Sequence, residues 1–168
     1  MTGASCFFIG YHDCPDDYFN PLMATIDTQI AVNNITEFFV GNHGNFDRLA
    51  TQAVQLIKQH DRRIHLYLVL PSPRRFFILP EGFDNAYCPP RAKSSRSAII
   101  SANRHMVDTV NYVITCANGR GTNTDKLLRY AHPRIIAGDL HVKNIMRLAA
   151  RFDNQLTEPS GDDMIDLS

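Results

Sequence analysis

The sequence predicts an α/β protein with a Rossmann-like parallel sheet of about five strands, flanked by helices on both faces. Short, almost wholly apolar segments alternate with longer segments in which apolar residues recur at helical spacing. The apolar segments lack the polar and apolar alternation of half-exposed strands, which indicates strands buried on both faces. At 168 residues, 44% of them hydrophobic, the chain is long enough for one such domain.

The first half of the chain supplies three strands and two helices to this prediction. Glycine or proline closes each apolar run, so strands are expected at 5–10, 36–41 and 63–71. Apolar residues fall on one helical face in the segments 16–34 and 45–60. Asp16 or Asp17 is expected to cap the first helix.

The second half continues the alternation. Helices are expected at 98–110 and 124–131, around a fourth strand at 111–117. The segment RIIAG (134–138) is interpreted as the fifth strand and HVKNIMRLAARF (141–152) as the last helix. We expect one domain over residues 1–155 and an acidic, disordered tail over 156–168.

One long stretch, residues 71–97, has no helical or strand pattern. It holds five of the nine prolines and five basic residues, Arg74, Arg75, Arg91, Lys93 and Arg96. A loop of this length in a compact domain is usually functional or disordered. Its apolar run FFIL (76–79) favours packing over disorder, so we interpret the stretch as a lid over a site.

Composition limits the classes of function. The formal net charge is zero, but four acidic residues and no basic ones lie in the tail, leaving seventeen basic against thirteen acidic residues in the body. This weak excess makes nucleic acid an improbable partner. There is no membrane-length apolar run and no secretory signal, which predicts a cytoplasmic protein. The four cysteines form no C-x-x-C pair and their spacing does not favour a metal site, so no metal is expected. No dinucleotide-binding or P-loop fingerprint occurs either, and no cofactor is expected.

Polar and glycine residues cluster at three predicted strand ends. In a Rossmann-like order the third, second, first, fourth and fifth strands lie side by side, and ligands bind beyond their carboxyl ends. The ends in question read GYHD (10–13), GNHGNFD (41–47) and ANGRGTNT (117–124). Their convergence predicts a ligand site at this edge of the sheet.

The loop after the fourth strand is suited to an anion. Gly119 and Gly121 let the backbone approach a ligand closely, and Thr122 or Asn123 is expected to cap the helix that starts near Asp125. Free N–H groups at such a helix start suit a phosphate.

The charged candidates each have two interpretations. Arg104 and Asp108 are spaced as a solvated helical ion pair, or Arg104 binds a ligand phosphate. His12 and His43 follow strand-end glycines and serve equally well as a hydrogen-bonding wall or as a general base. Asp47 either complements a helix dipole or lines the site, and Glu81 is either an exposed loop acid or a second carboxylate there.

The motifs CFFIGYHD, FFVGNHGNFDRLATQAV, LPEG, PPR and NRHMVDTVNYVITCANGRGT occur in one order over roughly residues 5–137. In this the chain resembles the SLOG superfamily, the Rossmann-like group that joins DprA-type DNA-processing proteins to LOG-type phosphoribohydrolases, and its small stand-alone bacterial members in particular. The resemblance implies a pocket for a nucleotide-type ligand. The implied site residues are Gly10, His12, Asp13, Gly41, Asn42, Gly44, Asp47, Glu81, Arg91, Asn103, Arg104, Gly119, Gly121 and Thr122.

Three functions follow as expectations. The first is binding of a nucleotide or nucleotide-derived, signalling-type ligand, by a chain that forms a homodimer as related domains often do. The second is nucleotide N-glycosidase chemistry with Asp125 or Glu81 as the catalytic carboxylate, although Asp125 stands where LOG-type enzymes carry Glu. The third is single-stranded nucleic-acid binding through Arg74, Arg75, Arg91 and Arg96, which the neutral charge makes the weakest of the three.

Overall fold

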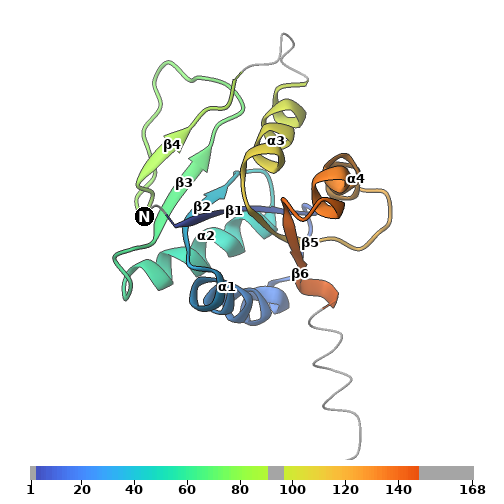
Figure 1. Ribbon diagram of the computed structural model, residues 1–168. Helices are drawn as coiled ribbons and strands as arrows, with labels where there is room; N and C mark the ends of the chain where they lie inside the picture. Colours follow the sequence, from blue (N-terminus) through green and yellow to red (C-terminus); the bar gives the residue numbers. More distant parts are fainter. Residues whose placement is uncertain (1–2, 91–96, 148–168) are drawn as a thin grey trace, which may run out of the picture.

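The computed structural model describes residues 3–90 and 97–147, which form one six-stranded parallel sheet with helices on both faces (Figure 1). The strand order is β4-β3-β2-β1-β5-β6. The strands are β1 (Ala4–Gly10), β2 (Ile35–Val40), β3 (His65–Val69), β4 (Asn85–Tyr87), β5 (Tyr112–Cys116) and β6 (His141–Asn144). The α/β, Rossmann-like prediction is confirmed, and so is the order of the first four predicted strands, which are β3, β2, β1 and β5; β4 and β6 form the two edges.

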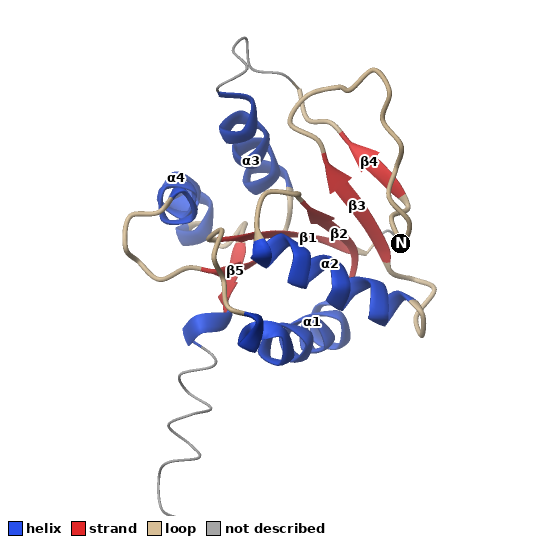
Figure 2. Ribbon diagram, turned by 180° about the vertical axis from the view of Figure 1, so that it is seen from behind, coloured by secondary structure: helices blue, strands red, loops and turns tan. Residues whose placement is uncertain are grey.

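In the described part of the chain, four α-helices cover the sheet, and residues 145–147, directly after β6, are also helical. The four helices are α1 (Phe19–Asn33), α2 (Asn45–Lys58), α3 (Ala98–Thr109) and α4 (Asn123–Ile136), and a 3-10 turn, η1 (Asp16–Tyr18), precedes α1. Figure 2 shows α1 and α2 side by side across one face of the sheet. The residues of α3 and α4 pack on the other face.

The alternating side chains of β1 divide the core into two layers. Cys6 and Phe8 point to the α1 and α2 side, where Phe8 stacks on Phe38 with ring centroids 5.6 Å apart. Phe7 points to the α3 and α4 side and packs in one cluster with Met106. A strand apolar on both faces is expected at the centre of a parallel sheet, and β1 lies between β2 and β5.

The end of the predicted pattern is wrong in one place. Residues 134–136 of the expected strand RIIAG form the last turn of α4. The last strand is instead β6, at the start of the segment 141–152 that was expected as a helix, and residues 145–147 of that segment are helical as expected. Arg134 explains the last turn of α4, because its guanidinium donates hydrogen bonds to the carbonyls of Val107, Val110 and Asp139 and so fixes the end of α4 against the end of α3. Ile136 is 72% exposed, which a central strand would not allow.

Two smaller expectations also fail. Asp16 and Asp17 do not cap α1, whose N-cap is Tyr18, and Asp16 instead accepts hydrogen bonds from Asn45 and Arg48. The stretch 71–97 is not wholly irregular, because it contains β4. Residues 91–96 of the expected lid, with Arg91, and the expected tail lie outside the described residues.

Candidate functional site

A pocket of about 560 Å³ lies at the carboxyl ends of β1 and β2. Its walls come from two strand ends, the first turns of α2 and α4, and one face of α3. Of the predicted site residues, those that line it are Gly10, His12, Asp13, Gly41, His43, Gly44, Asp47, Asn103 and Thr122. The pocket therefore lies at the edge of the sheet where the strand-end argument expects a ligand site.

Two glycines allow the loop after β1 to lie against the start of α2. A Cβ atom on Gly10 would lie 2.4 Å from Cγ of Phe46, and one on Gly44 would lie 2.8 Å from Cα of His12. The N–H of Asn45 donates to the carbonyl of His12 over 2.9 Å. These contacts fix the wall that carries His12 relative to the wall that carries His43.

Asp47 places a carboxylate in the first turn of α2. Its side chain is 9% exposed and accepts a hydrogen bond of 2.9 Å from the N–H of His43. Burial raises the pKa of Asp47 above its ordinary value, although the His43 N–H and the nearby imidazoles favour the ionised form. A buried carboxylate of this kind suits a ligand hydroxyl or amine better than a ligand phosphate.

The start of α4 is the more suitable place for a phosphate. Thr122 is the N-cap, with a capping box formed by Thr122 and Asp125. As at every helix start, the first N–H groups have no acceptor within the helix. Asn123 and Thr124, which follow the cap, both line the pocket, so this helix start presents the arrangement that binds anions elsewhere.

Asp125 holds the loop before α4. Its carboxylate accepts hydrogen bonds from the N–H groups of Gly119 and Thr122 at 3.1 and 2.9 Å. Burial opposes ionisation of Asp125, but the hydrogen bonds from Thr122, Gly119 and Gly121 outweigh it and lower its pKa. Gly119 and Gly121 have φ of 74° and 75°, a conformation that favours glycine. Neither glycine lines the pocket, and nor does Asp125; the three residues shape the loop that leads into α4.

Arg104 lies away from this pocket. Its guanidinium carbon is 4.7 Å from the centre of the Tyr130 ring, and Tyr130 donates a 2.7 Å hydrogen bond to Asp108. The three residues line a second hollow of about 440 Å³ between α3 and α4. The helix turns Asn103 toward the first pocket and Arg104 toward the second, and no Arg104 to Asp108 ion pair is found in the described part of the chain.

Glu81 lies at the opposite end of the sheet, which corrects its expected place near the site. The backbone carbonyl of Glu81 accepts a hydrogen bond from the side chain of Gln55 in the last turns of α2. Nearby, the carboxylate of Asp84 accepts a hydrogen bond from the N–H of Leu66 at the start of β3. Asn42 sits between two lining residues without lining the pocket itself.

Seven lining residues are not among the predicted site residues: Phe7, Phe8 and Ile9 of β1, and Tyr11, Ile99, Asn123 and Thr124. Tyr11 directly follows Gly10, so its position at a strand end was an available signal. Asn123 was itself one of the two expected caps, and Thr124 directly follows it. Ile99 gave no such signal, because its spacing with Met106 placed it with the core, yet it is 43% exposed at the pocket.

The lining carries no lysine or arginine among the residues that the structure describes. Its charged or titratable members are Asp13, Asp47, His12 and His43, and His12 Nδ1 lies 2.9 Å from Asp13 Oδ1. A phosphate would therefore be bound by backbone N–H groups and by the helix dipole. No group of three or more metal-ligating side chains is found within residues 3–90 and 97–147.

Comparison with known proteins supports the fold. The chain is similar to DNA processing protein A from Helicobacter pylori, with a TM-score of 0.51, 12% identity, and coverage of 92% of this chain and 82% of that one. That protein is described as binding single-stranded DNA. No protein-family model and no curated protein matches the sequence. In the described chain, every helix is too short or too polar to cross a lipid bilayer.

This comparison corrects the expectation that nucleic acid is an improbable partner. That expectation rested on a net charge near zero. A protein of similar fold binds single-stranded DNA, so a net charge near zero is not sufficient reason to exclude nucleic acid as a partner. The positions of the charged residues on the surface are the better criterion.

Proposed function

We propose that the chain binds single-stranded nucleic acid at the carboxyl ends of its parallel strands. The observation that supports this most directly is the pocket itself, in which Asn123 and Thr124 at the start of α4 face the loop carrying His12. The helix start supplies N–H groups for one phosphate. Asn103 and the histidines supply hydrogen-bonding groups for a sugar or base edge.

Local charge supports the same proposal. Arg120 lies in the loop after β5, and Arg74 and Arg75 lie in the loop after β3. All three are exposed and leave the sheet at the same edge as the pocket. Single strands are bound through such a basic track combined with surfaces on which bases stack. The motifs shared with the SLOG superfamily, which includes DprA-type proteins, are consistent with this partner.

A second candidate is a free nucleotide, favoured by the volume of the pocket. About 560 Å³ falls within the usual range for small-molecule sites. For the hydrolytic alternative we find little support, because the hydrogen bonds of Asp125 are used within its own loop and Glu81 lies at the other end of the sheet.

The test is fluorescence anisotropy with a labelled dT oligonucleotide of about twenty nucleotides, repeated at several salt concentrations. Binding that weakens steeply with salt is expected, with a log–log slope near −0.7 for each phosphate contact. Nucleoside monophosphates are then added as competitors and recovered for mass spectrometry. Binding of a mononucleotide without binding of the oligonucleotide would replace the main proposal with the second candidate.

A further inference from the structure

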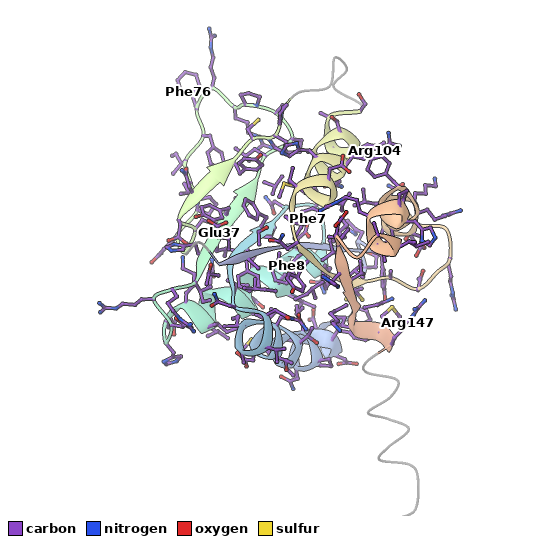
Figure 3. All side chains as sticks on the ribbon, viewed as in Figure 1. Phe7, Phe8, Glu37, Phe76, Arg104 and Arg147 are labelled. Carbon is purple, nitrogen blue, oxygen red and sulfur yellow. The ribbon has the colours of Figure 1, made fainter. Side chains whose placement is uncertain are left out.

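The loop between β3 and β4 exposes a basic and aromatic segment whose side chains are not accounted for by the fold. Phe76 is 96% exposed and Ile78 is 88% exposed, and Arg74 and Arg75 beside them are also exposed. We call residues 74–79 the arm. In Figure 3, Phe76 stands at the outer end of this loop, away from the helices.

The exposure in the arm follows a pattern. Phe76 and Ile78 face solvent, whereas Phe77 and Leu79, each the next residue along the chain, are half-buried. Alternation with a period of two is the pattern of an extended segment with one side against the protein. The arm therefore presents one apolar side outward by its own geometry.

The base of this loop is held in place. Lys58 at the end of α2 donates to the carbonyl of Gly82 at 3.0 Å and to the carboxylate of Asp84 at 2.6 Å. Asp84 in turn accepts from the N–H of Leu66, and Gln55 donates to the carbonyl of Glu81. The loop is tied to α2 and β3 just beyond the arm, which limits how far the exposed side chains can fold back.

The charges of the arm are unpaired. Within residues 3–90 and 97–147, neither Arg74 nor Arg75 has an ion-pair partner, whereas Arg48 pairs with Asp16 and Arg63 pairs with Asp61. Two free guanidinium groups next to a free aromatic ring match a polyanion whose units carry flat rings. Phosphates pair with guanidinium groups, and bases stack on aromatic side chains.

We propose that the arm is a second contact for the nucleic acid, in which Phe76 stacks on a base while Arg74 and Arg75 pair with the flanking phosphates. The inference rests on the proposed function of the pocket, but it names a different surface. The strand order supports a continuous path, because the arm leaves the carboxyl end of β3, and only β2 separates β3 from β1 at the pocket.

The chain contains no tryptophan, so the substitution Phe76→Trp gives a single tryptophan reporter, whose emission is separated from that of the six tyrosines by selective excitation. Titration with the dT oligonucleotide is expected to quench this fluorescence and to saturate with the binding curve measured by anisotropy. Ile136→Trp, at an exposed apolar position of α4, is the matched control and is expected to stay unquenched.

Affinity provides the second measurement. Phe76→Ala is expected to weaken binding by about 5- to 150-fold, the range for loss of one stacked base. Arg74→Ala and Arg75→Ala should each reduce the salt slope by about 0.7. Arg62→Ala, an exposed arginine before β3 at the other end of the sheet, is the matched control and should leave both quantities unchanged.

The outcomes separate the arm from the pocket. If the unaltered chain binds the oligonucleotide while Phe76→Ala binds equally well and Phe76→Trp is not quenched, the proposed role of the arm is wrong and the proposed function stands. If the unaltered chain does not bind the oligonucleotide, both are wrong. A blue shift of the Phe76→Trp emission with phosphatidylglycerol–phosphatidylcholine vesicles, without quenching by the oligonucleotide, would identify the arm as a membrane contact and overturn the proposal.

Discussion

Thr122 and Asp125 each bind the backbone of the other at the start of α4. The N–H of Thr122 donates to Asp125 Oδ2 over 2.9 Å, and the N–H of Asp125 donates to Thr122 Oγ1 over 3.3 Å. The pair satisfies two N–H groups that a helix start leaves without a partner. Asn123 and Thr124, which lie between the two residues, line the pocket, and their N–H groups are among those that have no acceptor within the helix.

Asp125→Ala is expected to lower the free energy of unfolding by about 1 kcal/mol, as loss of a helix cap does. Thr122→Ala should have a similar effect, and the double variant should lose less than the sum of the two, because the residues form one unit. Urea denaturation measures all three. Asp27→Ala, at an exposed carboxylate of α1, is the control for loss of a charge. Additive effects would contradict the reciprocal cap.

The stability contributed by Asp125 should depend on pH in a defined direction. Its pKa is lowered in the folded chain, so its contribution is present above the unfolded pKa of an aspartate, about 3.9, and is lost as pH falls through the folded pKa. The difference in melting temperature between the unaltered chain and Asp125→Asn should therefore shrink below pH 4. A difference that grows on acidification would contradict the lowered pKa.

Asp47→Asn should behave in the opposite way. Because burial raises the pKa of Asp47, the folded chain favours the protonated form, and its contribution to stability is present at low pH and lost as pH rises through the folded pKa. Asparagine can still accept the His43 N–H without a buried charge. The melting temperature of Asp47→Asn relative to that of the unaltered chain should rise between pH 4 and 7. The affinity of this variant for the oligonucleotide should also be higher than that of the unaltered chain. A stabilisation that does not change with pH would show that Asp47 is not perturbed.

Gly10→Ala tests the contact between the β1 loop and α2. The new methyl group would overlap Phe46, which predicts a loss of about 1–3 kcal/mol in the free energy of unfolding, the usual cost of overpacking. In the Phe46→Ala background the same substitution should cost much less, because the overlapping ring is gone. An equal cost in both backgrounds would place the strain elsewhere.

Thiol labelling tests the packing around the pocket floor. Of the four cysteines, Cys88 alone is exposed, whereas Cys6, Cys14 and Cys116 are buried, with Cys14 Sγ and Cys116 Sγ 3.0 Å apart. Burial also raises the pKa of the Cys6 thiol, which makes the reactive thiolate scarcer. A short pulse of iodoacetamide should modify Cys88 first, as read by peptide mass spectrometry, and all four cysteines only after denaturation. Equally fast labelling of Cys14 would show that the loop opens.

The central part of the fold follows from the sequence because buried parallel strands leave an unmistakable pattern. β1, β2, β3 and β5 are apolar on both faces, and a glycine, proline or alanine marks each end. The edge strands carry no such pattern. β4 has three residues, and β6 is the sequence HVKN, whose His141 and Lys143 are exposed. An edge strand needs little burial, so periodicity and hydropathy do not reveal it.

Part of the pocket lining was also predictable from the sequence. Strand ends and helix starts are placed by local sequence, and they supply most of the lining. Arg104 and Glu81 were misplaced for different reasons. The direction of Arg104 depends on the Tyr130 ring of another helix. The position of Glu81 depends on a loop that returns to the far end of the sheet, which nothing in the local sequence around it specifies.

The strand order has a consequence for what a ligand does to the molecule as a whole. The wall formed by His12 and His43 comes from the chain before residue 90, and the wall formed by Asn103 and Thr122 comes from the chain after residue 97. A bound ligand thus joins two separately encoded parts of the polypeptide, which otherwise meet mainly where β1 pairs with β5. Since binding to the native form alone adds RT ln(1 + [L]/Kd) to its stability, a bound ligand should hold these parts together and slow any proteolysis that requires the chain to unfold.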